Sequence, residues 1–183
     1  MKEARVFGED YATLFGILKE CRKDKKVVMA SGTFDLFHIG HMRMLEAAKE
    51  QGDILVVAVK SDRAAALKKE DPPVLNQSIR METIANCIWA DYVVLADYNP
   101  YRQVPFSFAN ESAYQWLNMF APVVEGIRPD VFVHEDNPLL REARRQLFSC
   151  YNVSGYIQPR TDGISTTEII DRIRTRLLQQ MQR

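Results

Sequence analysis

The segment from Lys26 to His41 reads KVVMASGTFDLFHIGH, and it gives the clearest indication of the fold. It begins with a short apolar run, Val27 to Ala30, whose length and β-branched residues predict a buried strand. Gly32 follows almost at once, and a helix-like pattern then occupies about residues 40–52. A strand that passes through a short turn into a helix is the opening of a βαβ unit.

The same alternation continues along the rest of the chain. Further strands are predicted at residues 54–59, 92–96, 131–133 and 153–157. Further helices are predicted at about residues 10–23, 62–69, 77–89, 112–126, 138–150 and 165–181. We therefore expect an α/β fold: a Rossmann-like, doubly wound parallel sheet of about five strands, with helices on both faces. We expect one domain over residues 1–183, with an ordered loop or lid at about 97–110 that serves function or packs on the body or a second subunit.

Composition narrows the possible functions. The chain has 183 residues, of which 46% are hydrophobic, and its 24 Lys+Arg balance its 24 Asp+Glu. The zero net charge argues against a nucleic-acid-binding protein, and no apolar run approaches the ~18 residues needed to span a bilayer. The N-terminus lacks the apolar stretch of a secretory signal, and three scattered cysteines make no disulfide framework. These features predict a soluble cytoplasmic protein without membrane insertion.

Two histidines mark the first candidate site. His38 and His41 are three residues apart on the first turn of the predicted helix, with Gly40 between them, so both rings can face one side. The helix N-terminus supplies free N–H groups, and a glycine allows a ligand to approach the backbone. This arrangement suits a phosphate whose developing charge the imidazoles stabilise. Alternatively, the histidines only cap the helix; a zinc site would need further ligands.

A second candidate site opens the last helix. Residues 160–167 read RTDGISTT, and Ser165 is a good helix N-cap with Glu168 three residues later. Such a cap can be purely structural. However, Arg160 and Thr161 precede it directly, and an arginine with several hydroxyl groups at a helix N-terminus suits the phosphates of a nucleoside triphosphate. Both sites follow strands, so we expect them at the same edge of the sheet.

The HIGH tetrapeptide and the RTDGIST segment, about 120 residues apart, resemble the HxGH and RTxGIST motifs of the cytidylyltransferase-like nucleotidylyltransferases. The resemblance implies catalytic roles for His38, His41, Arg160, and Lys68 or Lys69, the lysines holding the triphosphate unless they are only a solvated helix end. It assigns nucleotide binding to Gly32, Thr33, Phe34, Asp35, Gly40, Arg80, Thr161, Gly163, Ile164, Ser165 and Thr166. Alternatively, Arg80 is an ordinary arginine on the surface of a helix.

A third segment, His134-Glu135-Asp136, looks like the HDDxP stretch of the phosphocholine and phosphoethanolamine enzymes. The resemblance implies that these three residues bind the acceptor substrate, unless they form only a polar turn. Choline enzymes place an acidic residue where this chain has Ser31, so the acceptor differs or is held differently. Magnesium is the implied cofactor, with Asp35 a candidate ligand.

The implied reaction transfers a nucleoside monophosphate, most simply from CTP, to a small phosphorylated acceptor and releases pyrophosphate. One alternative is an ATP-dependent adenylyltransferase of the heptose-1-phosphate type, which shares the entry motif and a terminal STT. Another is a non-catalytic, nucleotide-binding regulatory module. The resemblance also implies a homodimer.

Overall fold

The computed structural model describes residues 5–67, 72–106 and 110–182. Its strands form one sheet in the order β1-β4-β3-β2-β5-β6, and every neighbouring pair is parallel. The strands are β1 (Arg5–Gly8), β2 (Val27–Gly32), β3 (Ile54–Lys60), β4 (Tyr92–Ala96), β5 (Val131–His134) and β6 (Ser154–Ile157). The helices are α1 (Tyr11–Cys21), α2 (Ile39–Lys49), α3 (Asp62–Ala66), α4 (Gln77–Ala85), α5 (Glu111–Ile127), a 3-10 turn η1 (Pro138–Leu140), α6 (Arg141–Tyr151) and α7 (Thr166–Met181).

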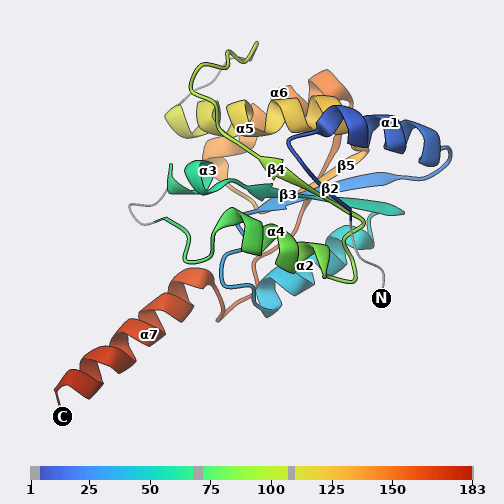
Figure 1. Ribbon diagram of the computed structural model, residues 1–183. Helices are drawn as coiled ribbons and strands as arrows, with labels where there is room; N and C mark the ends of the chain where they lie inside the picture. The colour runs from blue at the N-terminus through green and yellow to red at the C-terminus, as the bar shows by residue number, and fades with distance from the viewer. Residues whose placement is uncertain (1–4, 68–71, 107–109, 183) are drawn as a thin grey trace.

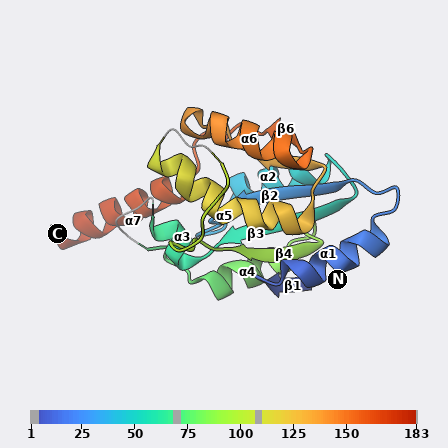
Figure 2. The same ribbon diagram turned by 90° about the horizontal axis from the view of Figure 1, so that it is seen from above.

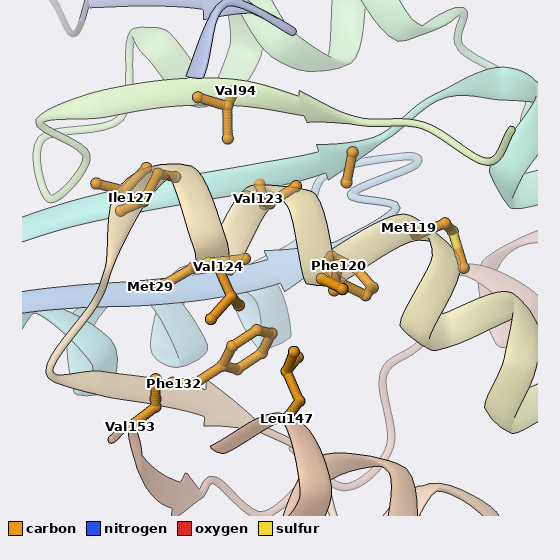
Figure 3. Packing of buried hydrophobic residues seen from close by; sticks show 14 of the residues in the cluster. Met29, Val94, Met119, Phe120, Val123, Val124, Ile127, Phe132, Leu147 and Val153 are labelled. Carbon is orange, nitrogen blue, oxygen red and sulfur yellow. The ribbon is translucent and has the colours of Figure 1, made fainter. Parts of the chain in front are cut away.

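Each face of the sheet carries its own apolar core, because successive strand residues point to opposite faces. Met29 of β2 and Phe132 of β5 belong to the core shared with α1, α5 and α6, and Figure 3 shows Phe132 beside Leu147 of α6. Val28 of β2 belongs to the core shared with α2 and α4. The two helix layers therefore sandwich the sheet, as Figures 1 and 2 show.

The predicted architecture is confirmed, with one strand more than the five expected. Strand β1 pairs with β4 at the sheet edge and was missed because it is only four residues long and partly exposed. Every predicted helix is present, although its bounds shift by a few residues. The last helix, α7, extends away from the sheet in both views and contains no buried residue.

The described part of the 97–110 segment is a loop, as predicted. The buried side chain of Asn118 in α5 holds it: its Oδ1 accepts from the Asn99 N–H, and its Nδ2 donates to the carbonyl oxygens of Asn99 and Arg102. Tyr98, Val104 and Phe106 pack against the core. The loop is therefore anchored to the body, and a functional role for it remains a prediction.

Strand register brings several strand ends to one edge of the sheet. Gly32 of β2 pairs with Val59 of β3, Lys60 with Ala96 of β4, and His134 of β5 with Ile157. Ligands of open parallel sheets bind at this carboxyl edge. Within the described ranges, no helix is long and apolar enough to cross a bilayer.

Candidate active site

The two histidines of the first motif form the N-terminal cap of α2. Nδ1 of His38 accepts a hydrogen bond from the Gly40 N–H at 3.1 Å. Nδ1 of His41 accepts one from the His38 N–H at 3.4 Å. The rings stack, with their centroids 3.8 Å apart. The capping role that the sequence allowed is thus present, and it holds both rings side by side.

This capping arrangement determines which ring nitrogen can donate. Because Nδ1 of each ring accepts from a backbone N–H, the proton of each neutral imidazole lies on Nε2. Burial, followed by the nearby charge of His38, lowers the pKa of His41 from 6.5 to about 4. Burial also lowers the pKa of His38. At neutral pH both rings are therefore neutral, with an Nε2–H not committed to the cap.

The turn between β2 and α2 has an unusual backbone. Phe34 and Leu36 have φ values of 56° and 44°, in the left-handed region that larger side chains rarely adopt. The Phe34 ring is buried over Gly32, where a Cβ would lie only 2.9 Å from its Cζ. A glycine at position 32 is therefore required for this close packing, and the strained turn directs the following histidines to the carboxyl edge.

The second motif lies directly against the first, as expected. The Thr166 hydroxyl donates to the backbone oxygen of Asp35 at 2.8 Å. A Cβ on Gly40 would lie 3.5 Å from Cγ2 of Ile164, so the two motifs leave little space between them there. Ser165 caps α7 by accepting from the Glu168 N–H, which confirms the predicted cap. The N-termini of α2 and α7 are thereby brought together.

Arg160 extends into solvent beside this junction. Its side chain is 76% exposed, and its guanidinium pairs with the Glu135 carboxylate at 2.7 Å. Thr161 is half-buried and Gly163 is exposed in the turn that follows, where Gly163 has a φ of 73°. Lys68 and Lys69, the predicted triphosphate contacts, lie outside the described residues.

Arg80 has a different environment from the one expected. Its side chain is 0% exposed, and it donates to the carbonyl oxygens of Thr33 and Leu75 and to the Asp62 carboxylate. It is therefore not the surface arginine that one interpretation allowed. Its guanidinium is also not open to a ligand in this structure, so nucleotide contact by Arg80 gains no support here.

Asp35 is likewise engaged within the protein. It is 6% exposed, and its carboxylate accepts from the backbone N–H groups of Leu36, Val74 and Leu75. Among the residues placed by the structure, no three His, Cys, Asp or Glu side chains form a group suited to a metal ion. These side chains do not fit a magnesium site built by the protein alone.

The three predicted acceptor residues point to different partners. Glu135 pairs with Arg160, whereas Asp136 pairs with Arg141 at 2.7 Å. The His134 ring lies 5.8 Å from the Phe148 ring of α6, and its Nδ1 contacts the carbonyl oxygen of Glu135. Only Glu135 therefore contacts a residue of the other motifs directly.

Two further charged groups at this edge were not predicted from the sequence. Asp97, which follows β4, binds the Ser61 hydroxyl and the Arg63 guanidinium. Arg144 of α6 is 8% exposed and donates to the carbonyl oxygen of Glu135. The sequence offered a signal for each residue. Asp97 is a carboxylate that directly follows a predicted strand, and Arg144 is one of three arginines in one predicted helix.

The lowered pKa of His41 predicts acid sensitivity. The unfolded chain takes up a proton at pH 6.5, whereas the folded chain resists it until about pH 4. The free energy of unfolding should therefore fall as pH decreases from 6.5 to about 4. Above pH 6.5, titration of His41 should add nothing to the pH dependence of stability. Urea unfolding at several pH values checks this, with His41→Phe as the control. An equal pH slope in both proteins would show that other groups cause the loss.

Solved structures with low sequence identity confirm the fold. A lipopolysaccharide core biosynthesis protein of Thermoplasma volcanium aligns with a TM-score of 0.53 at 23% identity, over 75% of this chain and 97% of its own. Pantoate-beta-alanine ligase of Francisella tularensis aligns with a TM-score of 0.63 at 14% identity, over 91% of this chain and 75% of its own. These neighbours show that the chain shares their α/β fold with a parallel sheet.

The sequence defines the family more narrowly. Residues 29–172 match the model of the cytidylyltransferase-like family, and the chain belongs to that family. Ethanolamine-phosphate cytidylyltransferase of Dictyostelium discoideum is 31% identical over 148 residues, which is 80% of this chain and 36% of that protein. Bifunctional protein HldE of Geobacter sulfurreducens is 33% identical over 159 residues, 86% of this chain and 29% of that protein. The chain thus spans about a third of the length of these relatives.

Proposed function

We propose that the chain is a nucleotidylyltransferase that transfers a nucleoside monophosphate, most simply from CTP, to a small phosphorylated acceptor. The observation that carries this proposal is the pair of Nε2–H donors held by the α2 cap, next to the N-terminus of α7. Two helix N-termini and two neutral imidazoles together form an array of hydrogen-bond donors. Such an array suits the oxygens of a triphosphate.

In the proposed reaction, an oxygen of the acceptor phosphate attacks the α-phosphorus in line. A new P–O bond forms as the bond to the β-phosphate bridging oxygen breaks, and pyrophosphate leaves. His38 and His41 donate to the α-phosphoryl oxygens, whose charge must be stabilised in the transition state. No proton transfer to either ring and no covalent enzyme intermediate is required.

The leaving pyrophosphate is assigned to the N-terminus of α7 and to Arg160. The Thr166 hydroxyl already donates to Asp35, whereas the Ser165 hydroxyl only accepts from the Glu168 N–H. The Ser165 O–H and the backbone N–H groups of the first turn are therefore the donors assigned to the pyrophosphate. Arg160 is exposed and, among the residues that the structure describes, Glu135 is its one ion-pair partner. A triphosphate can take the place of this carboxylate. Lys68 and Lys69 keep their proposed role as further triphosphate contacts.

Magnesium is proposed as a companion of the nucleotide. Because the Asp35 carboxylate already accepts three backbone hydrogen bonds, we assign it to holding the 72–75 segment. The phosphate oxygens of the nucleotide are the natural ligands of a hard divalent cation.

CTP is favoured by the cytidylyltransferase-like family and by the Dictyostelium relative, which is an ethanolamine-phosphate cytidylyltransferase. Several matches to HldE proteins keep the alternative of ATP with a sugar 1-phosphate. The acceptor is proposed to lie near Glu135, and Ser31 disfavours a quaternary amine because position 31 has no carboxylate.

A homodimer is also proposed, and sedimentation at several protein concentrations tests it.

Pyrophosphate release is the direct test of the activity. The protein, with magnesium, is mixed with CTP or ATP and one of phosphoethanolamine, phosphocholine, glycerol 3-phosphate or a sugar 1-phosphate. We expect turnover with CTP and one phosphorylated acceptor. Turnover only with ATP and a sugar 1-phosphate would select the alternative enzyme. Nucleotide binding without turnover for any pair would favour the regulatory module.

A further inference from the structure

A cavity lies at the edge of the sheet, between α6 and the last two strands, β5 and β6. Its volume is about 280 Å³. Arg141, Arg144 and Arg145 of α6 line it together with one carboxylate, Asp136, and the remaining lining residues are His134, Phe148, Gly155 and Ile157. It therefore combines cationic groups with an apolar and aromatic wall.

This cavity is separate from the paired histidines of α2. His134 lies two residues after Phe132 on β5, so it points to the same face of the sheet, where α5 and α6 pack. Helix α2, which begins next to His38, covers the opposite face, as Figure 1 shows. A ligand in this cavity would thus not occupy the proposed α-phosphate position.

Arg144 is the residue that makes the cavity unusual. It is 8% exposed, and its Nε is a buried donor without a hydrogen-bond acceptor. One Nη donates to the Glu135 carbonyl oxygen, and the guanidinium lies 5.6 Å from the centre of the Trp116 ring. Within the described ranges it forms no ion pair with a carboxylate. Burying such a charge without a counter-ion is costly.

The neighbouring charges leave Arg144 uncompensated. Arg141 pairs with Asp136, and Arg145 pairs with Glu142, both at the exposed mouth. These two pairs are neutral as units, so the cavity has a net charge close to one positive unit. The His134 Nδ1 donates to the Glu135 carbonyl oxygen, so Nε2 of the neutral ring is an acceptor and adds no donor for an anion. One anionic group of a ligand would complete this set of partners.

We propose that this cavity binds the phosphate group of a small phosphate monoester, with its organic part against Phe148 and Ile157. The guanidinium of Arg144 contacts the phosphate oxygens, since a planar fork of donors matches their geometry. The cavity volume suits a small molecule rather than a macromolecular segment. His134 and Asp136, which the sequence assigned to the acceptor, line this cavity, whereas the acceptor proposed above lies near Glu135 and Arg160. The cavity is therefore a second phosphate site beside the proposed acceptor position.

Trp116 allows this site to be observed alone. The chain has two tryptophans, so Trp89→Phe leaves Trp116, the ring beneath Arg144, as the only one. In this background, inorganic phosphate and phenyl phosphate are titrated at constant ionic strength while the emission is recorded. We expect saturable binding of both, with phenyl phosphate the tighter. If inorganic phosphate bound but phenyl phosphate did not, the proposed contact of the organic group with Phe148 and Ile157 would be wrong.

Variants identify which arginine is responsible. Arg144→Met should raise Kd about tenfold or more, the equivalent of one charge-assisted hydrogen bond. Arg176→Gln, an exposed arginine of α7, should leave Kd unchanged. Arg160→Gln should also leave it unchanged, which separates the cavity from the proposed triphosphate site. Unchanged binding in Arg144→Met, or loss in Arg160→Gln, would overturn the proposal.

Arg144→Met can also destabilise the fold, so circular dichroism accompanies each titration. If that variant does not fold, Arg145→Gln at the exposed mouth provides the second test, with an expected weakening of a few fold. If a folded Arg145→Gln protein kept its full affinity while Arg160→Gln lost binding, the phosphate would bind at the triphosphate site and the proposal would be wrong.

Discussion

Replacing His41 with phenylalanine is expected to lower kcat for nucleotidyl transfer by about 10²- to 10³-fold, the usual effect of removing one preorganised donor. Phenylalanine keeps the ring that packs between Phe34, Phe37 and His38. It removes the Nε2–H and also the long 3.4 Å cap bond that Nδ1 accepts from the His38 N–H. The loss should appear mainly in kcat, because the charge on the α-phosphoryl oxygens grows in the transition state. KM for the nucleotide should change much less.

Steady-state pyrophosphate release measures this effect, and a neighbouring substitution controls for disturbance of the helix. Met42→Ala alters the next residue of α2, which is 37% exposed, and should retain nearly full activity. A second comparison uses His41→Ala, which removes both the donor and the ring packing. If His41→Phe retained near-normal kcat while His41→Ala lost it, the ring would act through packing, and the proposed role in phosphoryl stabilisation would be wrong.

Local sequence patterns predicted that the two histidines share the first turn of α2 and that Ser165 caps α7, and the structure confirms both placements. His38 and His41 are three residues apart, and a helix places such a pair on one side whatever surrounds it. The contact between Thr166 and Asp35 spans 131 positions, yet it was predictable because parallel strands deliver their carboxyl ends to one edge. Topology therefore carried the long-range part of this prediction.

Side-chain burial could not be predicted in the same way. The pattern of α4 gave no sign that Arg80 is enclosed, because its partners Thr33 and Asp62 lie in other segments. Similarly, Arg144 is one of three arginines on α6, and only the packing of Trp116 distinguishes it from its exposed neighbours. Which of several similar residues is buried depends on tertiary contacts, and the local periodicity of the sequence carries no information about these contacts.

The Glu135 to Arg160 pair shows a related limit. Both residues belong to motifs that the sequence identified, one assigned to the acceptor and the other to the triphosphate. Their contact means that the two proposed subsites meet at this ion pair. A motif places a residue at the sheet edge but does not specify which neighbouring charge it contacts.

Replacing Arg80 with methionine is expected to lower the free energy of unfolding by about 3 kcal/mol, the range for removing one partner of a buried charged network. The guanidinium connects the end of β2 at Thr33, the segment before α4 at Leu75, and the start of α3 at Asp62. Methionine fills the same apolar volume but leaves two carbonyl oxygens and a carboxylate without this donor. Lysine should recover little, because one ammonium group cannot match the planar fork.

Arg63→Met is the matched control, because Arg63 also pairs with a carboxylate but lies at the surface. Its loss should cost less than about 1 kcal/mol. Urea unfolding of both variants gives the comparison, and nucleotide affinity of the folded protein gives the second measurement. Normal stability of Arg80→Met with strongly weakened nucleotide binding would restore Arg80 as a ligand contact. Reduced stability, with an affinity change no larger than the structural disturbance requires, would assign Arg80 to shaping the turn before α2. In that case the strained Phe34 turn, and with it the position of both histidines, depends on an arginine that never touches the nucleotide.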